Sequence, residues 1–325
     1  MFETHWGLPV VGYLFLAGVG SGALAVSASV LLRGGAGGFA HKHFQIARYG
    51  ALLAPLPLII GTGMIIFELG TFHAAIEHGE FWLLFRWINL FMTVNLSPMN
   101  LGSWALAFCI IASVVYAYTF WSSDAKPGDK LSSLRRGIAW INVPLGISVA
   151  VYTGVMLGAM PSRPFWNSPV LPLLFLMSAL STGVAGILLL KAVLDHKGVD
   201  DTQLVDPSGY LLSASDVMII GFEILAIFLF LMFAHLTIGA PADAVSTILA
   251  GGSLAVEFWI GVFLIGLVVP GFIELWYVVP QLIYKRPYKI PRHVEIVVCA
   301  VVLLGAFLLR YVVVISGQIT GPVGI

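Results

Sequence analysis

Long apolar runs recur along the whole chain and alternate with short polar connections. About 20 apolar residues in a helix are enough to cross the hydrocarbon core of a bilayer. The runs predict an all-α integral membrane protein with eight transmembrane helices, and an even number of crossings places both termini on one side. The predicted spans cover residues 9–32, 50–72, 99–121, 137–160, 169–194, 215–239, 254–281 and 294–316.

The basic residues predict which side of the membrane the termini face. Thirteen of the sixteen Lys and Arg residues lie in or beside the first, third, fifth and seventh connections. Basic residues stay on the cytoplasmic side of a membrane, so we expect both termini on the outer side. The thirteen are Arg33, Lys42, Arg48, Lys126, Lys130, Arg135, Arg136, Lys191, Lys197, Lys285, Arg286, Lys289 and Arg292.

Composition excludes several classes of protein. Hydrophobic residues make up 59% of the chain and charged residues 10%, against roughly 25% charged in a soluble domain. Equal numbers of acidic and basic residues give no reason to expect a nucleic-acid partner. Cys109 and Cys299 are too far apart for a CxxC metal site or a self-ligated cluster. His235 is the only histidine in the middle of a span, whereas haem b needs two, so we expect neither metal nor haem in this chain.

One set of polar side chains lies at similar depth in the outer half of four different spans: Tyr13, Glu68, Asn100 and Tyr152. A quinone needs an apolar slot, a hydrogen-bond donor for its carbonyl oxygen and a base that takes the quinol proton. The four residues are therefore candidates for quinone binding, with Glu68 and Tyr152 as the catalytic pair. The alternatives are that the tyrosines are interfacial anchors and that Glu68 pairs with a loop cation.

A second set of ionisable side chains lies in the last three spans: Glu223, His235, Glu257, Glu274 and Arg310. Such residues at membrane depth indicate either a proton path or structural pairing. The two possibilities stay open, because Glu223 and Glu274 are near the cytoplasmic end and Arg310 is placed to pair with Glu257. In the outer connections, Arg86, Arg163 and Trp166 are candidates for partner docking, although an aromatic belt also explains the tryptophan.

Several motifs together resemble the NrfD/PsrC family, the integral membrane subunits of polysulfide-reductase-type and nitrite-reductase-type respiratory complexes. No single motif is decisive, but their order along nearly the whole chain is that of the family. They are YLFLAGVGSG at 13–22, SPMNLGSW at 97–104, YTGVML at 152–157, RPFWNSPVLPLLFLMS at 163–178, Glu223, FWIG at 258–261, GLVVP at 266–270, LRY at 309–311 and Gly317-Gln318.

The resemblance implies an eight-helix fold, a quinone pocket among the first four helices near the outer face, and a four-cluster ferredoxin-like iron–sulfur subunit docked there. Tyr13 falls on a family position that carries a polar or aromatic residue. Tyr152 matches the tyrosine of the family's YTG motif. The second span of the family commonly ends in an Asp-Leu-Gly-Arg-Pro-like stretch, where this chain has Glu68-Leu-Gly-Thr-Phe72. The acid is retained as Glu68, and any role of the missing arginine would pass to Arg86 or Arg163.

We therefore expect a membrane anchor and quinol/quinone oxidoreductase subunit in a bacterial or archaeal cytoplasmic membrane, with its termini in the periplasm. Residues 1–160 would form a quinone-binding four-helix bundle and residues 161–325 a second bundle. The quinone would be menaquinone or ubiquinone, and the catalytic partner a molybdopterin or multihaem cytochrome subunit. The alternatives are a proton- or ion-translocating subunit and a purely structural anchor.

Overall fold

The computed structural model describes residues 6–33, 43–67, 76, 79–92, 97–121, 125–194, 207–237 and 239–320. All regular elements within these ranges are helices, and eight spans are long and apolar enough to cross a membrane. The predicted all-α fold is therefore confirmed. The helices are α1 (Leu8–Leu32), α3 (Phe44–Leu53), α4 (Pro55–Ile66), the 3₁₀ helix η2 (Phe81–Ile88), α6 (Asn89–Met92), α7 (Pro98–Trp121), α8 (Ser132–Gly158), α9 (Leu171–Leu194), α10 (Pro207–Leu236), α11 (Ala240–Val245), the π-helix η3 (Glu257–Val268), α12 (Val269–Tyr284) and α13 (Arg292–Ile319).

Two spans are built from consecutive helices. The second span runs from Phe44 to Ile66 through α3 and α4 and not over the predicted residues 50–72. It starts earlier because α3 is amphipathic, with Phe44 and Ile46 buried and Gln45 exposed, so a search for uniformly apolar sequence misses its first turn. The seventh span joins η3 directly to α12.

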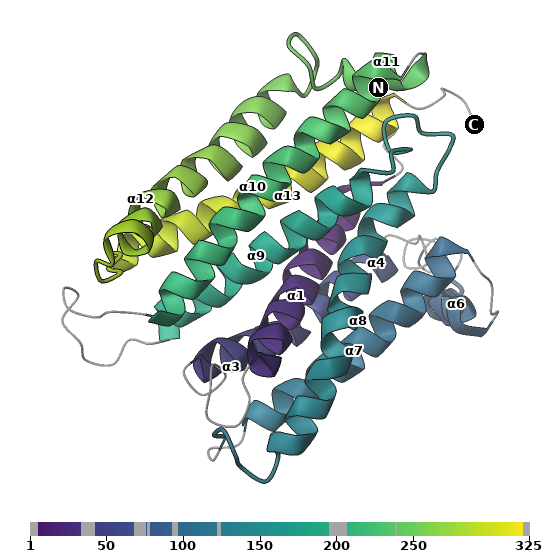
Figure 1. Ribbon diagram of the computed structural model, residues 1–325. Helices are drawn as coiled ribbons and strands as arrows, with labels where there is room; N and C mark the ends of the chain where they lie inside the picture. The colour runs from purple at the N-terminus through teal and green to yellow at the C-terminus, as the bar shows by residue number, and fades with distance from the viewer. Residues whose placement is uncertain are drawn as a thin grey trace.

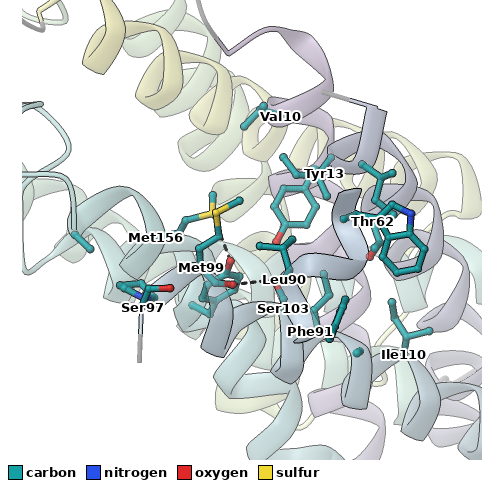
Figure 2. A pocket seen from close by; sticks show the side chains of 18 of the residues that line it. Val10, Tyr13, Thr62, Leu90, Phe91, Ser97, Met99, Ser103, Ile110 and Met156 are labelled. Carbon is teal, nitrogen blue, oxygen red and sulfur yellow. Dashed lines mark hydrogen bonds between the residues drawn. The ribbon is translucent and has the colours of Figure 1, made fainter. Parts of the chain in front are cut away.

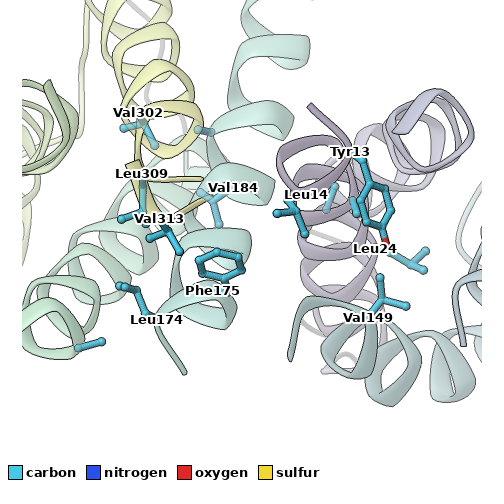
Figure 3. Close-up of a cluster of buried hydrophobic side chains, with 14 of the residues drawn as sticks. Tyr13, Leu14, Leu24, Val149, Leu174, Phe175, Val184, Val302, Leu309 and Val313 are labelled. Carbon is cyan, nitrogen blue, oxygen red and sulfur yellow. The ribbon is translucent and has the colours of Figure 1, made fainter. Parts of the chain in front are cut away.

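The helices lie in two neighbouring groups that meet at α1 and α9 (Figure 1). We call α1, α3/α4, α7 and α8 the first bundle, and α9, α10, η3/α12 and α13 the second bundle. The division of the chain at residue 160 stays a prediction, because α1 packs as extensively on α9 as it does on α8. The apolar core is continuous across this junction, from Leu14 and Val149 to Phe175 and Val313 (Figure 3).

Both described ends of the chain lie at the same end of the helices (Figure 1), which we call the terminal side. The opposite end, the basic side, carries the connections with Lys126, Lys130, Lys285 and Arg286. The basic connections therefore lie at the end of the helices opposite the termini, as the distribution of Lys and Arg along the sequence predicted. The assignment of the terminal side to the outside of the cell stays a prediction.

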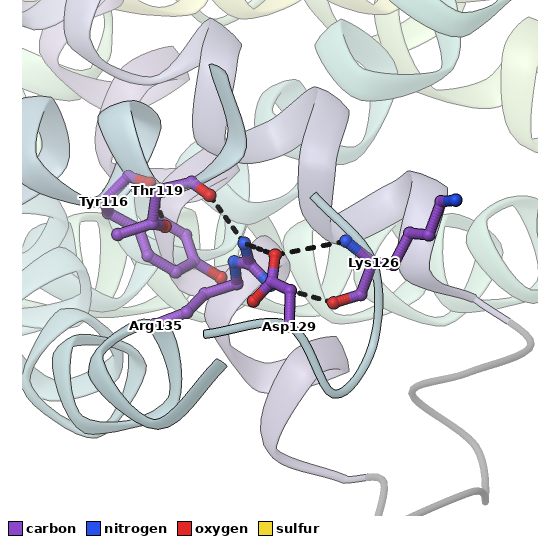
Figure 4. A network of polar contacts seen from close by, with 5 residues as sticks. All are labelled: Tyr116, Thr119, Lys126, Asp129 and Arg135. Carbon is purple, nitrogen blue, oxygen red and sulfur yellow. Dashed lines mark hydrogen bonds and ion pairs between the residues drawn. The ribbon is translucent and has the colours of Figure 1, made fainter. Parts of the chain in front are cut away.

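Arg135 organises the basic side of the first bundle (Figure 4). Its guanidinium is 1% exposed and lies 4.5 Å from the ring centroid of Phe120. It donates hydrogen bonds of 2.9 Å to the Asp129 carboxylate and 2.5 Å to the Thr119 carbonyl. These contacts hold the start of α8 against the end of α7. Partial burial alone would raise the pKa of Asp129, but hydrogen bonds from Arg135 and from the Lys126 amide outweigh it and lower this pKa.

We predict that Asp129→Asn lowers the unfolding free energy in mixed micelles by about 2 kcal/mol, because the buried guanidinium loses its charged acceptor. The exposed Lys130→Ala serves as the control. Since the folded pKa of Asp129 is below the unfolded value, the ion pair stabilises fully above about pH 4 and is lost as pH falls through the folded pKa. A difference between wild type and Asp129→Asn that persists below that range would contradict this assignment.

Candidate functional site

A cavity of about 560 Å³ opens in the first bundle near the terminal side (Figure 2). Its walls come from α1, α4, α7 and α8, and the segment Trp87–Phe91 covers one flank. The lining residues Met99 and Ile111 are 40% and 61% exposed on the lipid-facing surface, so the cavity is open toward the bilayer. The lining residues are Trp6, Val10, Tyr13, Thr62, Ile65, Ile66, Trp87, Leu90, Phe91, Ser97, Pro98, Met99, Ser103, Leu106, Ala107, Ile110, Ile111, Tyr152, Met156, Ala159 and Met160.

The described lining of this cavity is apolar and carries no charged side chain. Two of its hydroxyl groups are engaged with their own helices, since Thr62 donates to the Leu58 carbonyl at 2.7 Å and Ser103 to the Met99 carbonyl at 2.8 Å. The other donors in the described lining are the phenol groups of Tyr13 and Tyr152, the Ser97 hydroxyl and the indole N–H groups of Trp6 and Trp87. A flat, uncharged molecule with oxygen acceptors matches this lining.

Tyr13 and Tyr152 lie on facing helices, and their hydroxyl groups interact with each other. Tyr13 is 2% exposed on α1, whereas Tyr152 is half-buried on α8. The Tyr152 hydroxyl also donates to the Met156 sulfur at 3.5 Å. A thioether is a weak acceptor, so a carbonyl oxygen in the cavity would replace it readily. The structure thus brings together two of the four residues predicted to bind quinone.

The other two predicted quinone-binding residues have different positions. Asn100 is buried and does not line the cavity. Its side-chain amide donates to the Leu90 carbonyl and so holds α6 against the start of α7. Glu68 lies outside the described residues, two positions after Ile66, which lines the cavity.

The predicted docking residues Arg163 and Trp166 lie on the terminal side in a group of mutual contacts that we call the clasp. Its members are Trp6, Arg163, Trp166, Val313 and Gln318. Trp166 is 2% exposed, stacks on Trp6 at 5.2 Å between ring centroids, and donates from Nε1 to the Val313 carbonyl at 2.7 Å. Arg163 is half-buried and donates to the Gln318 carbonyl at 2.9 Å. Gln318 in turn bonds both backbone groups of Trp6. Burial in this clasp keeps Trp166 from presenting its ring to a partner, while docking through Arg163 stays a prediction. Arg86 lies in η2, and its side chain is outside the described part of the protein.

The second bundle separates the residues predicted to form a proton path. Arg310 is 1% exposed, donates to the Ser178 hydroxyl at 2.6 Å and interacts electrostatically with Glu223. The expected Arg310–Glu257 pair is wrong, because α13 turns Arg310 toward α9 and α10 while Glu257 lies half-exposed at the first residue of η3. His235 is exposed near the terminal end of α10.

Glu274 has a partner that the sequence analysis missed. It is 2% exposed on α12 and interacts with Asp216 of α10, which is 1% exposed. Asp216 precedes Glu223 by seven residues, so both carboxyl groups lie on one face of α10. This heptad spacing is the signal in the sequence that could have identified Asp216.

Comparisons with known proteins identify the family of this chain. The model of the family described as "Polysulphide reductase, NrfD" matches residues 2–322. One of the polysulfide reductase chains of Wolinella succinogenes is 29% identical over 97% of this protein and 94% of its own length. Protein NrfD of Escherichia coli is 26% identical over 97% and 95%. One of the selenate reductase subunits of Mesobacillus selenatarsenatis is 22% identical over 73% of this protein and 57% of its own length. The family match spans nearly the whole sequence, and the chain therefore belongs to the NrfD polysulfide reductase family of multi-pass membrane proteins.

Proposed function

We propose that this chain is the quinol/quinone oxidoreductase subunit of a respiratory complex in the cytoplasmic membrane of a bacterium or archaeon. The observation that carries the proposal is the lipid-facing apolar cavity with two facing tyrosine hydroxyls. A quinol reaches such a site from the bilayer, its ring packs against apolar side chains, and its two oxygens accept or donate hydrogen bonds. Menaquinone and ubiquinone both meet this description.

Tyr13 and Tyr152 would hold the ring oxygens, and Glu68 would accept a proton from the quinol. Oxidation of one quinol to quinone releases two protons and two electrons. The electrons would pass to a four-cluster ferredoxin-like subunit docked on the terminal side, and from it to a molybdopterin or multihaem cytochrome subunit. Support for this partner arrangement comes from the relatives named as parts of polysulfide and selenate reductases. The reverse direction uses the same groups.

Gly102 is proposed to position Tyr152. A Cβ atom at Gly102 would lie 1.8 Å from the Tyr152 ring atoms Cε2 and Cζ. The ring therefore occupies the space that a side chain on α7 would fill. Glycine at this position lets the phenol lie flat on α7, with its hydroxyl near Tyr13.

We predict that Tyr152→Phe lowers kcat/KM for quinol by about fivefold, because the lost hydrogen bond is worth on the order of 1 kcal/mol. Glu68→Gln should lower kcat by about 100-fold or more if it is the proton acceptor. The control is Tyr118→Phe, a 70% exposed tyrosine on α7 outside the cavity lining. Unchanged turnover in both Tyr152→Phe and Glu68→Gln, assayed in the assembled complex, would refute the site. A purely structural anchor would in addition show no inhibition by quinol analogues.

We also predict that Gly102→Ala lowers kcat/KM for quinol by about 10- to 100-fold, because the added methyl group displaces the Tyr152 ring. Gly63→Ala in α4 is the matched control, since its Cβ would meet no atom within 4 Å. Alanine favours a helix over glycine by about 1 kcal/mol, which offsets part of the overpacking cost of about 1–3 kcal/mol at Gly102. Assembly of both variants is therefore checked before turnover is compared. Equal activity of the two variants would show that Gly102 does not position Tyr152.

A further inference from the structure

The short helical segment between the second and third spans is too short to cross the membrane itself. It runs from Phe81 to Met92 through η2, which has 8 residues, and α6, which has 4. A helical span needs about 20 residues. We call this segment the wedge. Its sequence, FWLLFRWINLFM, contains one charged residue, Arg86. So apolar a segment that does not span the membrane lies against some other apolar surface.

One face of the wedge carries a stripe of exposed apolar side chains. Trp82, Phe85 and Ile88 are spaced by three residues, and a 3₁₀ helix has three residues per turn, so they lie on one face of η2. Met92, four residues after Ile88, continues the stripe into α6. The exposed fractions of the four side chains are 64%, 60%, 36% and 76%. A continuous patch of this kind marks a contact with a membrane or with another protein.

Another face of the wedge closes the flank of the cavity. Trp87, Leu90 and Phe91 all line the cavity, and Figure 2 shows Leu90 and Phe91 beside Ser103 of α7. The rings of Trp87 and Phe91 meet edge to face, with 6.2 Å between their centroids. One short helical segment therefore separates the cavity from whatever covers the exposed stripe.

The wedge reaches a depth at which the bilayer surrounds the first bundle. Figure 1 shows α6 at the edge of this bundle, and α6 packs against α7. The ring of Phe91 packs edge to face on Trp104, with 5.2 Å between the centroids. Trp104 lies six residues after Pro98, the first residue of α7, which is about 9 Å along the helix axis. Trp104 packs in turn on Phe108, which is 55% exposed on the lipid-facing surface.

This depth and the chemistry of the stripe favour lipid over a protein as the partner. A subunit docked on the terminal side would contact the ends of the spans, whereas the wedge lies beside the outer turns of α7. Helices that lie in a membrane interface bury their apolar face to a depth of about 5–10 Å, and Trp and Phe are enriched on that face. The backbone of the wedge is helical, so its polar groups are paired internally, as contact with lipid requires.

We propose that the wedge is an interfacial membrane anchor whose exposed stripe contacts phospholipid acyl chains in the leaflet on the terminal side. The wedge is then held by lipid on one face, while the Asn100 side chain holds it to α7 through the Leu90 carbonyl. Lipid and cavity thus meet the same segment from two sides. This contact with lipid does not depend on which molecule fills the cavity.

The test places one polarity-sensitive fluorophore on the stripe, at Trp82→Cys or Phe85→Cys. Both positions are exposed, so the label displaces no packed side chain. The native Cys109 and Cys299 are 0% and 1% exposed, and the labelled wild type supplies the background. The full chain, alone and in its complex, is reconstituted in vesicles of phosphatidylethanolamine and phosphatidylglycerol. Emission is quenched either by iodide in the water or by lipids with a nitroxide on the acyl chain.

We expect both labels to emit at shorter wavelength than in water and to lose emission to nitroxides near the carbonyl end of the acyl chain, with little effect of iodide. This pattern corresponds to a depth of about 5–10 Å. Two control positions bracket the result. Phe108→Cys, deeper on the lipid face of α7, should respond most to nitroxides near the terminal methyl group. Asp243→Cys, on the exposed part of α11 at the terminal side, should respond to iodide.

Two results would overturn the anchor. Quenching of the stripe labels by iodide and not by lipid nitroxides, in the chain alone and in the complex, would place the stripe in water. Quenching by iodide that disappears only when the complex assembles would make the stripe a docking surface for a protein subunit. Because fluorescence quenching does not measure turnover, either result would leave the proposed quinone site to its own test.

Discussion

The close packing of α1 on α9 sets the positions of both polar regions in this protein. A Cβ atom at Gly22 would lie 1.8 Å from the Ala179 carbonyl oxygen, and one at Gly183 would lie 2.3 Å from the Gly22 carbonyl carbon. Only helices without side chains at these points approach so closely, and small residues are the usual means of helix association in a bilayer. The contact places α1 between the two bundles, so one face carries Tyr13 into the cavity and another leaves room for Arg310 at Gly18. A larger residue at Gly22 or Gly183 would separate the two regions.

The two polar regions differ in chemistry because the bilayer penalises charge far more than it penalises a hydroxyl. The described wall of the cavity offers hydroxyl groups among apolar side chains, which suits a neutral substrate that enters from lipid. The second bundle instead buries four carboxyl or guanidinium groups to within 2% exposure, Asp216, Glu223, Glu274 and Arg310. Packing alone does not require charged residues there, since apolar side chains of similar size would fill the same space without the desolvation penalty. This contrast supports a substrate site in the first bundle and a separate role for the second.

The sequence predicted much of the fold because the bilayer imposes a length and a composition on every span. Eight apolar runs and the alternation of basic connections were enough to obtain the helices and their shared terminal side. Tyr13 and Tyr152 were placed together by depth, which is a one-dimensional property of a helix. The depth of a residue does not say toward which neighbouring helix its side chain points. The sequence therefore suggested Glu257 as the partner of Arg310, whereas the structure places Ser178 there. For the same reason Trp166 was expected at the surface, although it packs over Gly317 inside the clasp, and Asp216 was missed.

We propose above that the first-bundle cavity binds a quinone. The most direct measurement is organic extraction of the purified complex, with the quinone identified and counted by mass spectrometry. We expect stoichiometric quinone in the wild type and in Val114→Phe, because Val114 is 45% exposed on α7. We expect that quinone to be lost in Ala107→Phe, because the larger ring fills the cavity. Equal quinone in both variants, or none in the wild type, would contradict it.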